Sequence, residues 1–380
     1  MTPCIGIRQE DESLLEHRAP LTPEQVRALT QEHAIEVLVQ PSSLRAIPER
    51  EYAQAGAKVM EDLSACPVIF GLKEIPPDDL LPNKVYIFFS HTIKGQSYNM
   101  PMLKKLLALN CTLIDYETIT DEAGRRLVFF GRHAGLAGMI ETLWAFGKRL
   151  ACEGIPNPFE KIRRPTEYPD LPTAKAKIAR AGRKLAAKGL PESLAPMIFG
   201  FAGYGHVSQG AQEIFNLLPF HEIDPADIAA IAAGPERISD VIYKVVFKEE
   251  HLVEPIDPGH QFELQDYYDH PEKYRSKFAG YLPHLTTLVN CVYWDDHYPR
   301  LVTNEDVRRL FAQDGQPRLR VIGDISCDIE GSIECTVRST HSDNPIYVYQ
   351  AATGETQDGC QGKGPVIMAV SNLPTELPAE

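Results

Sequence analysis

The sequence predicts an α/β protein of two domains, each built on a parallel sheet with helices between successive strands. Short, almost wholly apolar runs alternate with amphipathic stretches from the N-terminus onward, a pattern typical of parallel strands covered on both faces. A glycine-rich turn, flanked by strand and helix signals, lies near the middle of the 380 residues. A whole domain must therefore precede that turn.

The first part of the chain is expected to form a domain of roughly 130 residues. Thr22 is suited to cap a helix that has Pro23 in its first turn. Further helices are expected at 48–56 and 100–109. The expected strands are 4–8, 35–39, 67–73, 85–91, 112–117 and 126–130.

The second part is expected to begin with a long helix over 134–151, followed by a proline-rich irregular segment. A basic, alanine-rich helix over 174–188, with Thr173 as its cap, then leads to the central turn. Residues 248–283, rich in Tyr, His and acidic residues, are interpreted as an insertion over the site or at a subunit contact. The expected strands are 196–199, 220–224, 243–247, 286–293 and 318–325.

Composition excludes some classes of partner. The net charge of −14 argues against nucleic acid and anionic membranes, since both bind basic surfaces. No apolar run approaches a membrane span and no signal peptide is visible, which favours a cytoplasmic protein. The eight cysteines are scattered without zinc-site spacing, so we expect no metal and read the cysteines as reduced thiols.

The central turn predicts a dinucleotide-binding, Rossmann-like domain. It follows an apolar run, precedes a helical stretch, and reads G-F-A-G-Y-G-H-V-S-Q-G-A from Gly200. Such a turn lets backbone N–H groups approach a pyrophosphate. Ser208 replaces the third glycine of the fingerprint, with Gly210 following, and a plain structural turn is the alternative. The candidate cofactor-binding residues are Gly203, Tyr204, Gly205, His206 and Val207.

An acidic residue is expected at the end of the next strand, where it meets the adenosine ribose. Asp224 follows Gly203 by 21 residues, close to the usual spacing of about 20, and Glu222 is the second choice. A carboxylate there accepts hydrogen bonds from a ribose diol and repels a 2′-phosphate, which favours NAD over NADP. The alternative, a helix cap at Asp224, is compatible with this role.

Polar residues of the first domain also follow strands. Lys73 and His91 each close an apolar run, and ligands of parallel sheets bind at the carboxyl ends of strands. Both side chains suit proton transfer at neutral pH, although solvated loop charges are the alternative. Four more charged residues belong to this part of the chain, namely Glu16, Arg18, Glu117 and Arg126. Each alone is expected to be a surface residue, but together in one cleft they would form an acid-binding site.

Several motifs together give the chain a strong resemblance to the lysine-forming saccharopine dehydrogenases. That family shares its fold with alanine dehydrogenase and the nucleotide domains of transhydrogenase. Within it, the chain is most similar to the lysine–2-oxoglutarate reductase domain that is fused to a second saccharopine dehydrogenase. The motifs are E-H-R-A-P-L-T-P, G-L-K-E-I-P, F-F-S-H-T-I-K-G-Q, L-I-D-Y-E with G-R-R, F-G-R-H-A-G-L-A-G-M-I and G-D-I-S-C-D-I-E-G-S-I-E.

The resemblance implies an alanine dehydrogenase-like arrangement of two Rossmann-like domains with a cleft between them. The substrate domain would comprise 1–133 plus 335–380, and the dinucleotide domain 134–334. It also implies site roles for residues of this sequence. The catalytic residues would be Lys73, His91 and Glu117, the substrate-binding residues Glu16, Arg18 and Arg126, and the residue near the nicotinamide Asp324, with Asp328 as the alternative.

The implied reaction is reduction of the imine of L-lysine and 2-oxoglutarate to saccharopine, with NAD or NADP as cofactor. Asp224 favours NAD, whereas the fused reductase is usually linked to NADP. Only the first module of the fused enzyme is matched, so at most its first step is expected. The partners would be small molecules, in a monomer or homodimer. The alternatives are a related dehydrogenase with a different amine or keto acid, and a non-catalytic nucleotide-binding regulator.

Overall fold

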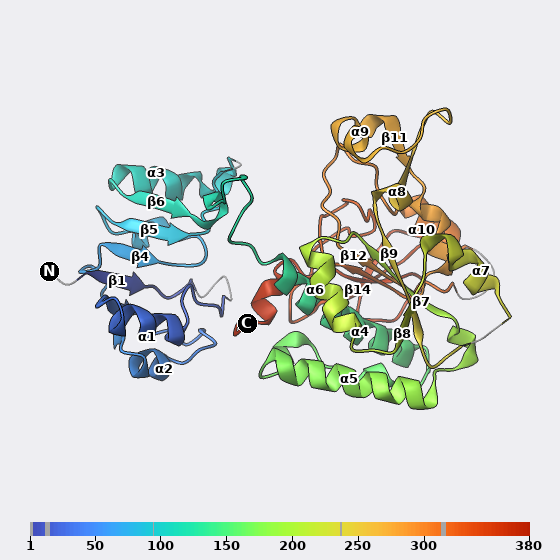
Figure 1. Cartoon of the computed structure of the whole chain (residues 1–380), viewed down its shortest axis with the longest axis horizontal. Helices are drawn as coiled ribbons and strands as arrows, with labels where there is room; N and C mark the ends of the chain where they lie inside the picture. Colours follow the sequence, from blue (N-terminus) through green and yellow to red (C-terminus); the bar gives the residue numbers. More distant parts are fainter. Residues whose placement is uncertain (1–2, 12–15, 94, 236–237, 313–316) are drawn as a thin grey trace. The chain divides into compact units, whose positions relative to one another are not determined.

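The computed structural model describes residues 3–11, 16–93, 95–235, 238–312 and 317–380. It divides into two compact units, unit 1 from Met1 to Phe129 and unit 2 from Phe130 to Pro378, shown in Figure 1. Each unit contains a sheet flanked by helices, all-parallel in unit 1 and mainly parallel in unit 2, which confirms the predicted α/β class. Within the described part of the chain, no helix combines the length and apolar character needed to cross a membrane.

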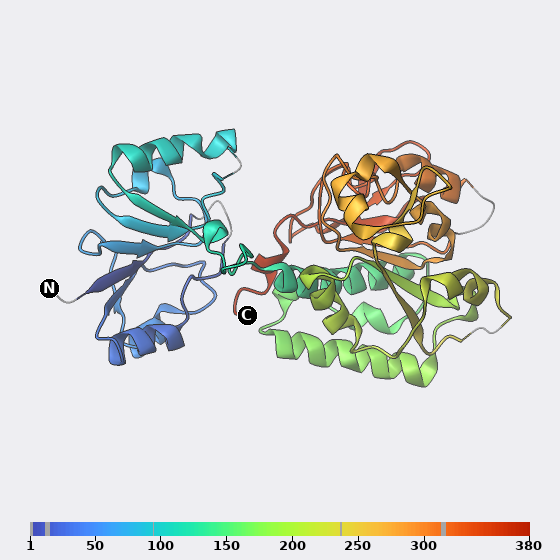
Figure 2. The same ribbon diagram turned by 45° about the horizontal axis from the view of Figure 1, so that its top comes forward.

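Unit 1 is a six-stranded, all-parallel sheet in the order β3-β2-β1-β4-β5-β6. Figure 2 shows α1 and α2 on one face and α3 on the other. Its elements are β1 (Cys4–Ile7), α1 (Pro23–Gln31), β2 (Glu36–Val39), α2 (Glu49–Gln54), β3 (Lys58–Val59), β4 (Val68–Phe70), β5 (Val85–Phe88), α3 (Met100–Ala108) and β6 (Thr112–Asp115).

The helices and strands of unit 1 follow from local sequence, with one exception. Thr22 caps α1 through a capping box with Gln25, as its position predicts. The expected strand at 126–130 does not form. Arg126 makes only an isolated bridge to Thr120 across a turn, so the apolar residues after it complete no sheet edge.

Unit 2 contains an eight-stranded sheet in the order β15-β14-β16-β13-β12-β7-β9-β8. Its strands are parallel except at β14, which runs antiparallel to both neighbours. The strands of this sheet are β7 (Met197–Ala202), β8 (Phe220–Glu222), β9 (Ile242–Phe247), β12 (Thr287–Asn290), β13 (Val321–Asp324), β14 (Ile346–Tyr349), β15 (Thr356–Asp358) and β16 (Val366–Met368).

The helices of unit 2 include the two long ones that the sequence predicts. Asp170, rather than Thr173, caps α5, because the helix starts one turn earlier than expected with Pro172 in its first turn. The insertion carries a separate hairpin of β10 (Val253–Pro255) and β11 (Tyr274–Ser276). The helices are α4 (Gly131–Cys152), α5 (Leu171–Lys188), α6 (His206–Phe215), α7 (Ile228–Ala233), α8 (Glu249–Leu252), α9 (Leu264–Asp269) and α10 (Asn304–Phe311).

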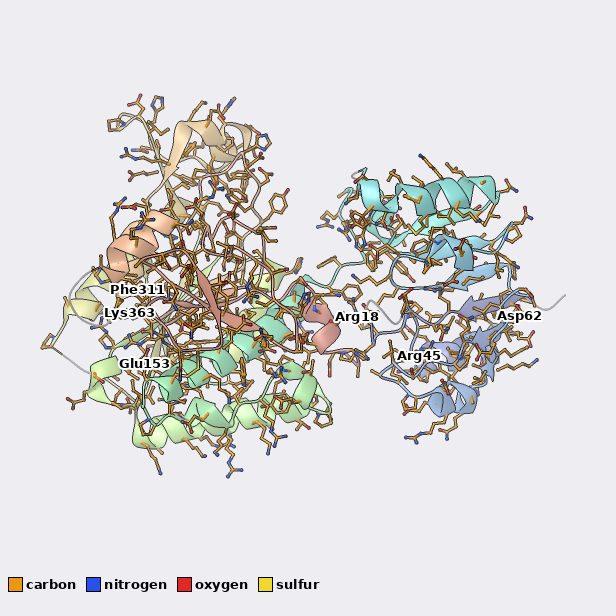
Figure 3. The ribbon with its side chains drawn as sticks, turned by 180° about the vertical axis from the view of Figure 1, so that it is seen from behind. Arg18, Arg45, Asp62, Glu153, Phe311 and Lys363 are labelled. Atoms are coloured by element: carbon orange, nitrogen blue, oxygen red, sulfur yellow. A yellow bond between two sulfur atoms is a disulfide. The ribbon has the colours of Figure 1, made fainter. Side chains whose placement is uncertain are left out.

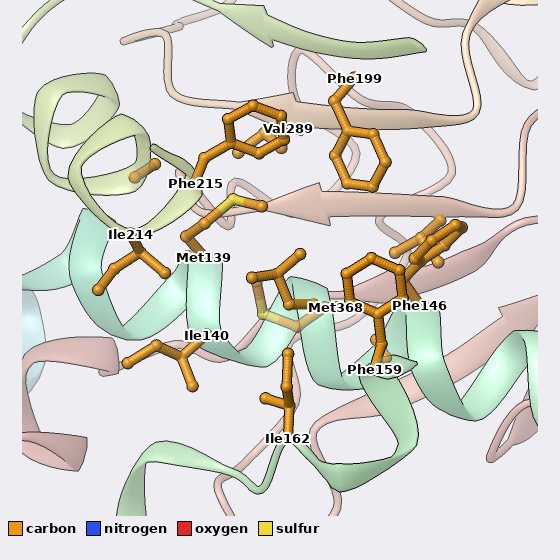
Figure 4. Packing of buried hydrophobic residues seen from close by; sticks show 14 of the residues in the cluster. Met139, Ile140, Phe146, Phe159, Ile162, Phe199, Ile214, Phe215, Val289 and Met368 are labelled. Atoms are coloured by element: carbon orange, nitrogen blue, oxygen red, sulfur yellow. The ribbon is translucent and has the colours of Figure 1, made fainter. Parts of the chain in front are cut away.

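Most of helix α4 is buried, and the helix organises the core of unit 2. Phe146 packs edge-on against Phe159 and Phe199, and Met139 lies beside Phe215 in the same cluster (Figure 4). The helix passes α6 with little space between the backbones. A Cβ added at Gly135 would lie 1.9 Å from the carbonyl oxygen of Val207, which is inside contact distance.

The predicted return of residues 335–380 to the first domain is wrong. This segment belongs to unit 2, where β16 pairs in parallel with β13 and β14 pairs with β16. Both strands are fully buried apolar runs, so they satisfy their backbone groups by extending the larger sheet.

The expectation of eight reduced thiols is also wrong. Cys152, at the end of α4 and next to Glu153 (labelled in Figure 3), forms a disulfide with Cys360. The other six cysteines are free. Sequence spacing gave no indication of this bridge, because its two cysteines are 208 residues apart and meet only through the sheet of unit 2.

Candidate active site

Lys73 lies just beyond the end of β4, and its backbone is held by a buried carboxylate. The Glu10 side chain, which follows β1, accepts hydrogen bonds from the backbone N–H groups of Leu72 (2.8 Å) and Lys73 (2.9 Å). Burial raises the pKa of Glu10, against the lowering effect of Arg8 and of these two hydrogen bonds. The turn that presents Lys73 is therefore fixed to the neighbouring strand β1.

His91 follows β5 in a left-handed backbone conformation, with φ of 47°. This conformation is uncommon for a side chain with a Cβ and often marks functional positions. The imidazole Nδ1 lies 2.6 Å from Oε1 of Glu74, the residue after Lys73. Buried Asn99 donates to Glu74 Oε1 (3.3 Å) and to the carbonyl of Ser90 (3.0 Å), which fixes both sides of the pair.

Glu74 was missed in the sequence, where it is simply the acidic residue after Lys73. Burial acts to raise its pKa, but hydrogen bonds from His91, from its own backbone N–H and from Asn99 outweigh that effect and hold the pKa below its ordinary value. Glu74 is thus ionised at neutral pH, as an acceptor for the histidine should be. The only available signal was its adjacency to Lys73.

Glu117 and Arg126 are brought together, as expected. Arg126 Nη1 donates to Glu117 Oε1 at 3.2 Å across the turn that follows β6. Asp115, at the end of β6, accepts from the backbone N–H of Glu117 (2.8 Å) and from the hydroxyl and N–H of Ser90. This carboxylate therefore ties Glu117 to the residue that precedes His91.

Glu16 and Arg18 form a bidentate pair. Arg18 Nε and Nη2 each donate to a different carboxylate oxygen of Glu16 at 2.8 Å. The Glu16 side chain is fully buried and that of Arg18 is nearly so. Two nitrogens of this guanidinium are therefore already bound to an internal carboxylate. Glu16 and Arg18 thus form a preorganised ion pair rather than two separate surface charges.

The glycine turn of unit 2 combines a sharp backbone turn with a helix N-terminus. Gly203 has φ of +93°, which only glycine adopts readily, and its N–H donates to Phe247 O. Gly205 is the N-cap of the ten-residue helix α6, and a Cβ placed there would meet no described atom within 4 Å. The N-terminus of α6 is therefore not covered by neighbouring atoms at Gly205, and no side chain of the described residues caps it.

Residues of this turn and of the first turn of α6 contact the insertion and helix α4. Tyr204 is half-exposed and lies beside Glu249 and Tyr268; its pKa is raised by burial and then by Glu249. The insertion therefore reaches the turn, as one of its two interpretations predicts. His206 and Val207 form the first turn of α6, where both pack against Gly131 at the start of α4.

Asp224 follows β8 and caps a short 3₁₀ turn (Pro225–Asp227) by accepting from the N–H of Ala226 at 2.9 Å. The alternative interpretation of Asp224 as a cap is thus confirmed, and it leaves the second carboxylate oxygen outside that bond. Burial lowers the pKa of His251 and raises the pKa of Tyr281. The Asp224 charge acts to raise both pKa values. Glu222 pairs with Lys244 of β9 at 3.0 Å.

Asp324 ends β13 and is buried in a polar network. It accepts hydrogen bonds from Asn290 Nδ2 (2.8 Å), Thr336 Oγ1 (2.6 Å) and the N–H of Cys327 (3.2 Å). Burial raises its pKa to about 6, against the lowering effect of these bonds. Asp324 thus joins the carboxyl ends of β12 and β13, the same sheet edge at which β7 leads into the glycine turn.

Comparison with known proteins finds a family match in the first part of the chain. The alanine dehydrogenase/PNT N-terminal domain family matches residues 6–137, which is nearly all of unit 1. This part of the chain is thus similar to the domains of that family. The whole chain is similar in fold to a solved L-alanine dehydrogenase, with a TM-score of 0.59 at 16% identity over 99% of this chain and 84% of that one.

Curated relatives match over the full length. The chain is 36% identical to alpha-aminoadipic semialdehyde synthase of Arabidopsis thaliana and to the mitochondrial enzyme of the same name from Bos taurus, over 99% of its residues in each case. It spans only 37% and 42% of those proteins. It is also 28% identical to saccharopine dehydrogenase [NAD(+), L-lysine-forming] of Emericella nidulans, over 96% of this chain and 84% of that protein. The resemblance to the saccharopine dehydrogenases is confirmed.

Proposed function

We propose that the chain is an oxidoreductase that reduces the imine of L-lysine and 2-oxoglutarate to saccharopine with a reduced nicotinamide dinucleotide, and catalyses the reverse. One observation carries the proposal. Lys73, His91 and Glu117, the residues that the saccharopine dehydrogenase resemblance implies, follow the adjacent strands β4, β5 and β6 and are linked by Glu74 and Asp115. The names of the relatives support the substrate class.

The reaction needs several proton transfers, because carbinolamine formation and loss of water precede reduction. His91, held by Glu74, serves these steps as acid and base. Lys73 and Glu117 hold and release the amine proton. Arg126 and Arg18 orient substrate carboxylates, with Arg18 held in place by the buried Glu16.

The glycine turn fits a dinucleotide, because Gly205 leaves open space in front of the α6 N-terminus and Gly203 makes the required sharp turn. When bound, the reduced nicotinamide supplies the hydride that the imine accepts. The N–H groups of the first turn of α6 would bind the pyrophosphate, and Asp224 the adenosine ribose. Asp324 would lie near the nicotinamide.

For the choice of cofactor we propose a preference for NADH over NADPH. Asp224 keeps one carboxylate oxygen outside its cap bond, and Glu222 is a second carboxylate at the same strand end. The Asp224 carboxylate would repel a 2′-phosphate, whereas the charge of Glu222 is balanced by Lys244. Asp224→Asn preserves the cap acceptor but removes the charge. It should therefore lower the ratio of kcat/KM with NADH to kcat/KM with NADPH. An unchanged ratio would remove Asp224 from cofactor selection.

A single assay tests the reaction. Oxidation of NADH and of NADPH is followed with 2-oxoglutarate and a panel of amines that includes lysine. His91→Gln and Lys73→Met should each lower kcat by about a hundredfold, the usual effect of losing a general acid or base. The controls His33→Gln and Lys104→Met change exposed residues of the same types. Wild-type turnover in both site variants would show that the site is assigned wrongly. Turnover with another amine but not lysine would overturn the substrate and keep the class.

A further inference from the structure

Unit 2 carries a second pocket that the proposed reaction does not use. It lies between α5 and the segment with two 3₁₀ turns, Pro158–Lys161 and Pro165–Glu167, that precedes this helix. Its volume is about 570 Å³. None of the residues of the glycine turn lines it, so it is distinct from the proposed cofactor site.

Positive charge dominates the lining, which contains five cationic and two acidic side chains. Helix α5 contributes Lys177, Arg180 and Lys184, which are spaced by three and four residues and so share one face of the helix. The neighbouring Ile178, Ala181 and Leu185 are buried and fix the orientation of that face. Figure 3 shows nitrogen-tipped side chains along this outer helix.

The opposite wall contributes Lys161 and Arg163. Among the described residues, none of the five cations has a carboxylate oxygen within 4 Å. Lys175 of the same helix, which does not line the pocket, pairs with Glu213 at 2.6 Å. Of the two acids in the lining, Glu167 is engaged by Arg164.

The lining is therefore net positive, with five cations against the carboxylates of Glu160 and Glu167, in a chain of net charge −14. Like charges at this spacing repel one another, and a bound anion removes that cost. The volume falls within the range of small-molecule sites, roughly 300–1,000 Å³. Lys177 and Lys184 of α5 are seven residue steps apart, which is about 10 Å of helix, longer than a single phosphate or carboxylate.

We propose that this pocket binds a phosphorylated polyanion of nucleotide size. Arginine forks and lysine ammonium groups are the side chains that bind phosphate most often, the former bidentately. The ring of Tyr168 and the faces of Pro158 and Pro169 line the same pocket and offer apolar surface for a ring attached to the phosphates.

Titration calorimetry on the full chain at low salt tests the proposal, with inorganic tripolyphosphate, ATP and citrate as probes. Lys177→Ala combined with Arg180→Ala should weaken tripolyphosphate binding at least about tenfold, because two charge-assisted hydrogen bonds are lost. The matched control is Arg183→Ala with Lys188→Ala, which removes two exposed cations of α5 that do not line the pocket. Binding by the control should stay within about twofold of wild type.

Three results would overturn the proposal. One is equal weakening in the control, which would mean non-specific attraction to a basic helix. Another is binding that is lost in Gly205→Ala but kept in the Lys177/Arg180 variant, which would place the anion at the glycine turn. The third is citrate binding as tightly as tripolyphosphate, which would exclude phosphate selectivity. ATP binding more tightly than tripolyphosphate would support a contact between the base and Tyr168.

Discussion

The Nδ1 atom of His91 lies 2.6 Å from a carboxylate oxygen of Glu74, the residue that directly follows Lys73. Two neighbouring strands thereby join their candidate proton-transfer groups through one carboxylate. Asn99 holds that carboxylate from the other side, and His91 accepts an uncommon backbone conformation to reach it. Orientation of the imidazole is thus fixed before substrate binds.

Glu74→Gln should lower kcat by roughly tenfold to a hundredfold with little change in KM, because the amide retains the shape but cannot stabilise a protonated imidazole. Steady-state kinetics with 2-oxoglutarate and lysine measure both constants. The control is Glu122→Gln, which changes an exposed residue in the turn after β6. A kcat equal to wild type would show that the His91–Glu74 pair is structural.

Gly135→Ala and Gly210→Ala should each lower the free energy of unfolding by about 2 kcal/mol or more, because the helices must separate to admit a methyl group. The added Cβ atoms would lie 1.9 Å from Val207 O and 2.1 Å from Arg132 O, respectively. Thermal and urea unfolding provide the measurement. At Gly280 a Cβ meets no described atom within 4 Å, so Gly280→Ala should be nearly neutral. A comparable loss in that control would refute a specific helix contact.

Gly205→Ala should separate cofactor binding from folding. Its Cβ meets no described atom, so the midpoint of thermal unfolding should fall only by the small amount that alanine costs at an N-cap. The methyl group would occupy the space in which a pyrophosphate approaches the α6 N-terminus, so the Kd for NADH should rise by about tenfold or more. Fluorescence titration with NADH measures this. An unchanged Kd for NADH in the folded variant would place the cofactor elsewhere.

The stability of unit 2 should depend on pH through two buried carboxyl groups. Glu141 of α4 and Glu376 of the C-terminal 3₁₀ turn (Leu373–Glu376) have buried carboxyl oxygens without a hydrogen-bond partner among the described residues. Burial raises the pKa of Glu376 from 4.5 to about 7, and burial and then the Glu376 charge raise that of Glu141. Arg164 lowers both values, Glu167 raises that of Glu141, and the nearby Ser342 side chain lowers that of Glu376.

Because these pKa values are raised, the folded state binds more protons than the unfolded state above pH 4.5. Stability therefore falls as pH rises from 4.5 to about 7, by ~3 kcal/mol from Glu376 alone. Urea unfolding across this range should show the decline, and Glu376→Gln should flatten it. Glu355→Gln, an exposed carboxylate of unit 2, should leave the slope unchanged. A flat wild-type profile would contradict the raised pKa values.

Local sequence predicted most elements of this fold, because strand burial, capping residues and glycine turns act over a few neighbouring residues. The capping box at Thr22, the strands that end near Lys73 and His91, and the turn at Gly203 are examples. The strand expected at 126–130 was wrong, since an apolar run becomes a strand only if a sheet edge is available to pair with it.

The sequence by itself also determined the candidate chemistry, since Lys73, His91 and Glu117 were recognised from their motifs. Tertiary structure decided what those motifs do not encode. Glu74 became the partner of His91 because β4 and β5 are neighbours, and Asp115 tied Ser90 to Glu117 across β5 and β6. The C-terminal strands joined the sheet of unit 2 rather than unit 1, and the Cys152–Cys360 disulfide formed with them. Each of these contacts joins residues that are distant in the chain or in separate motifs, so only the pairing of strands and the packing of helices brings them together.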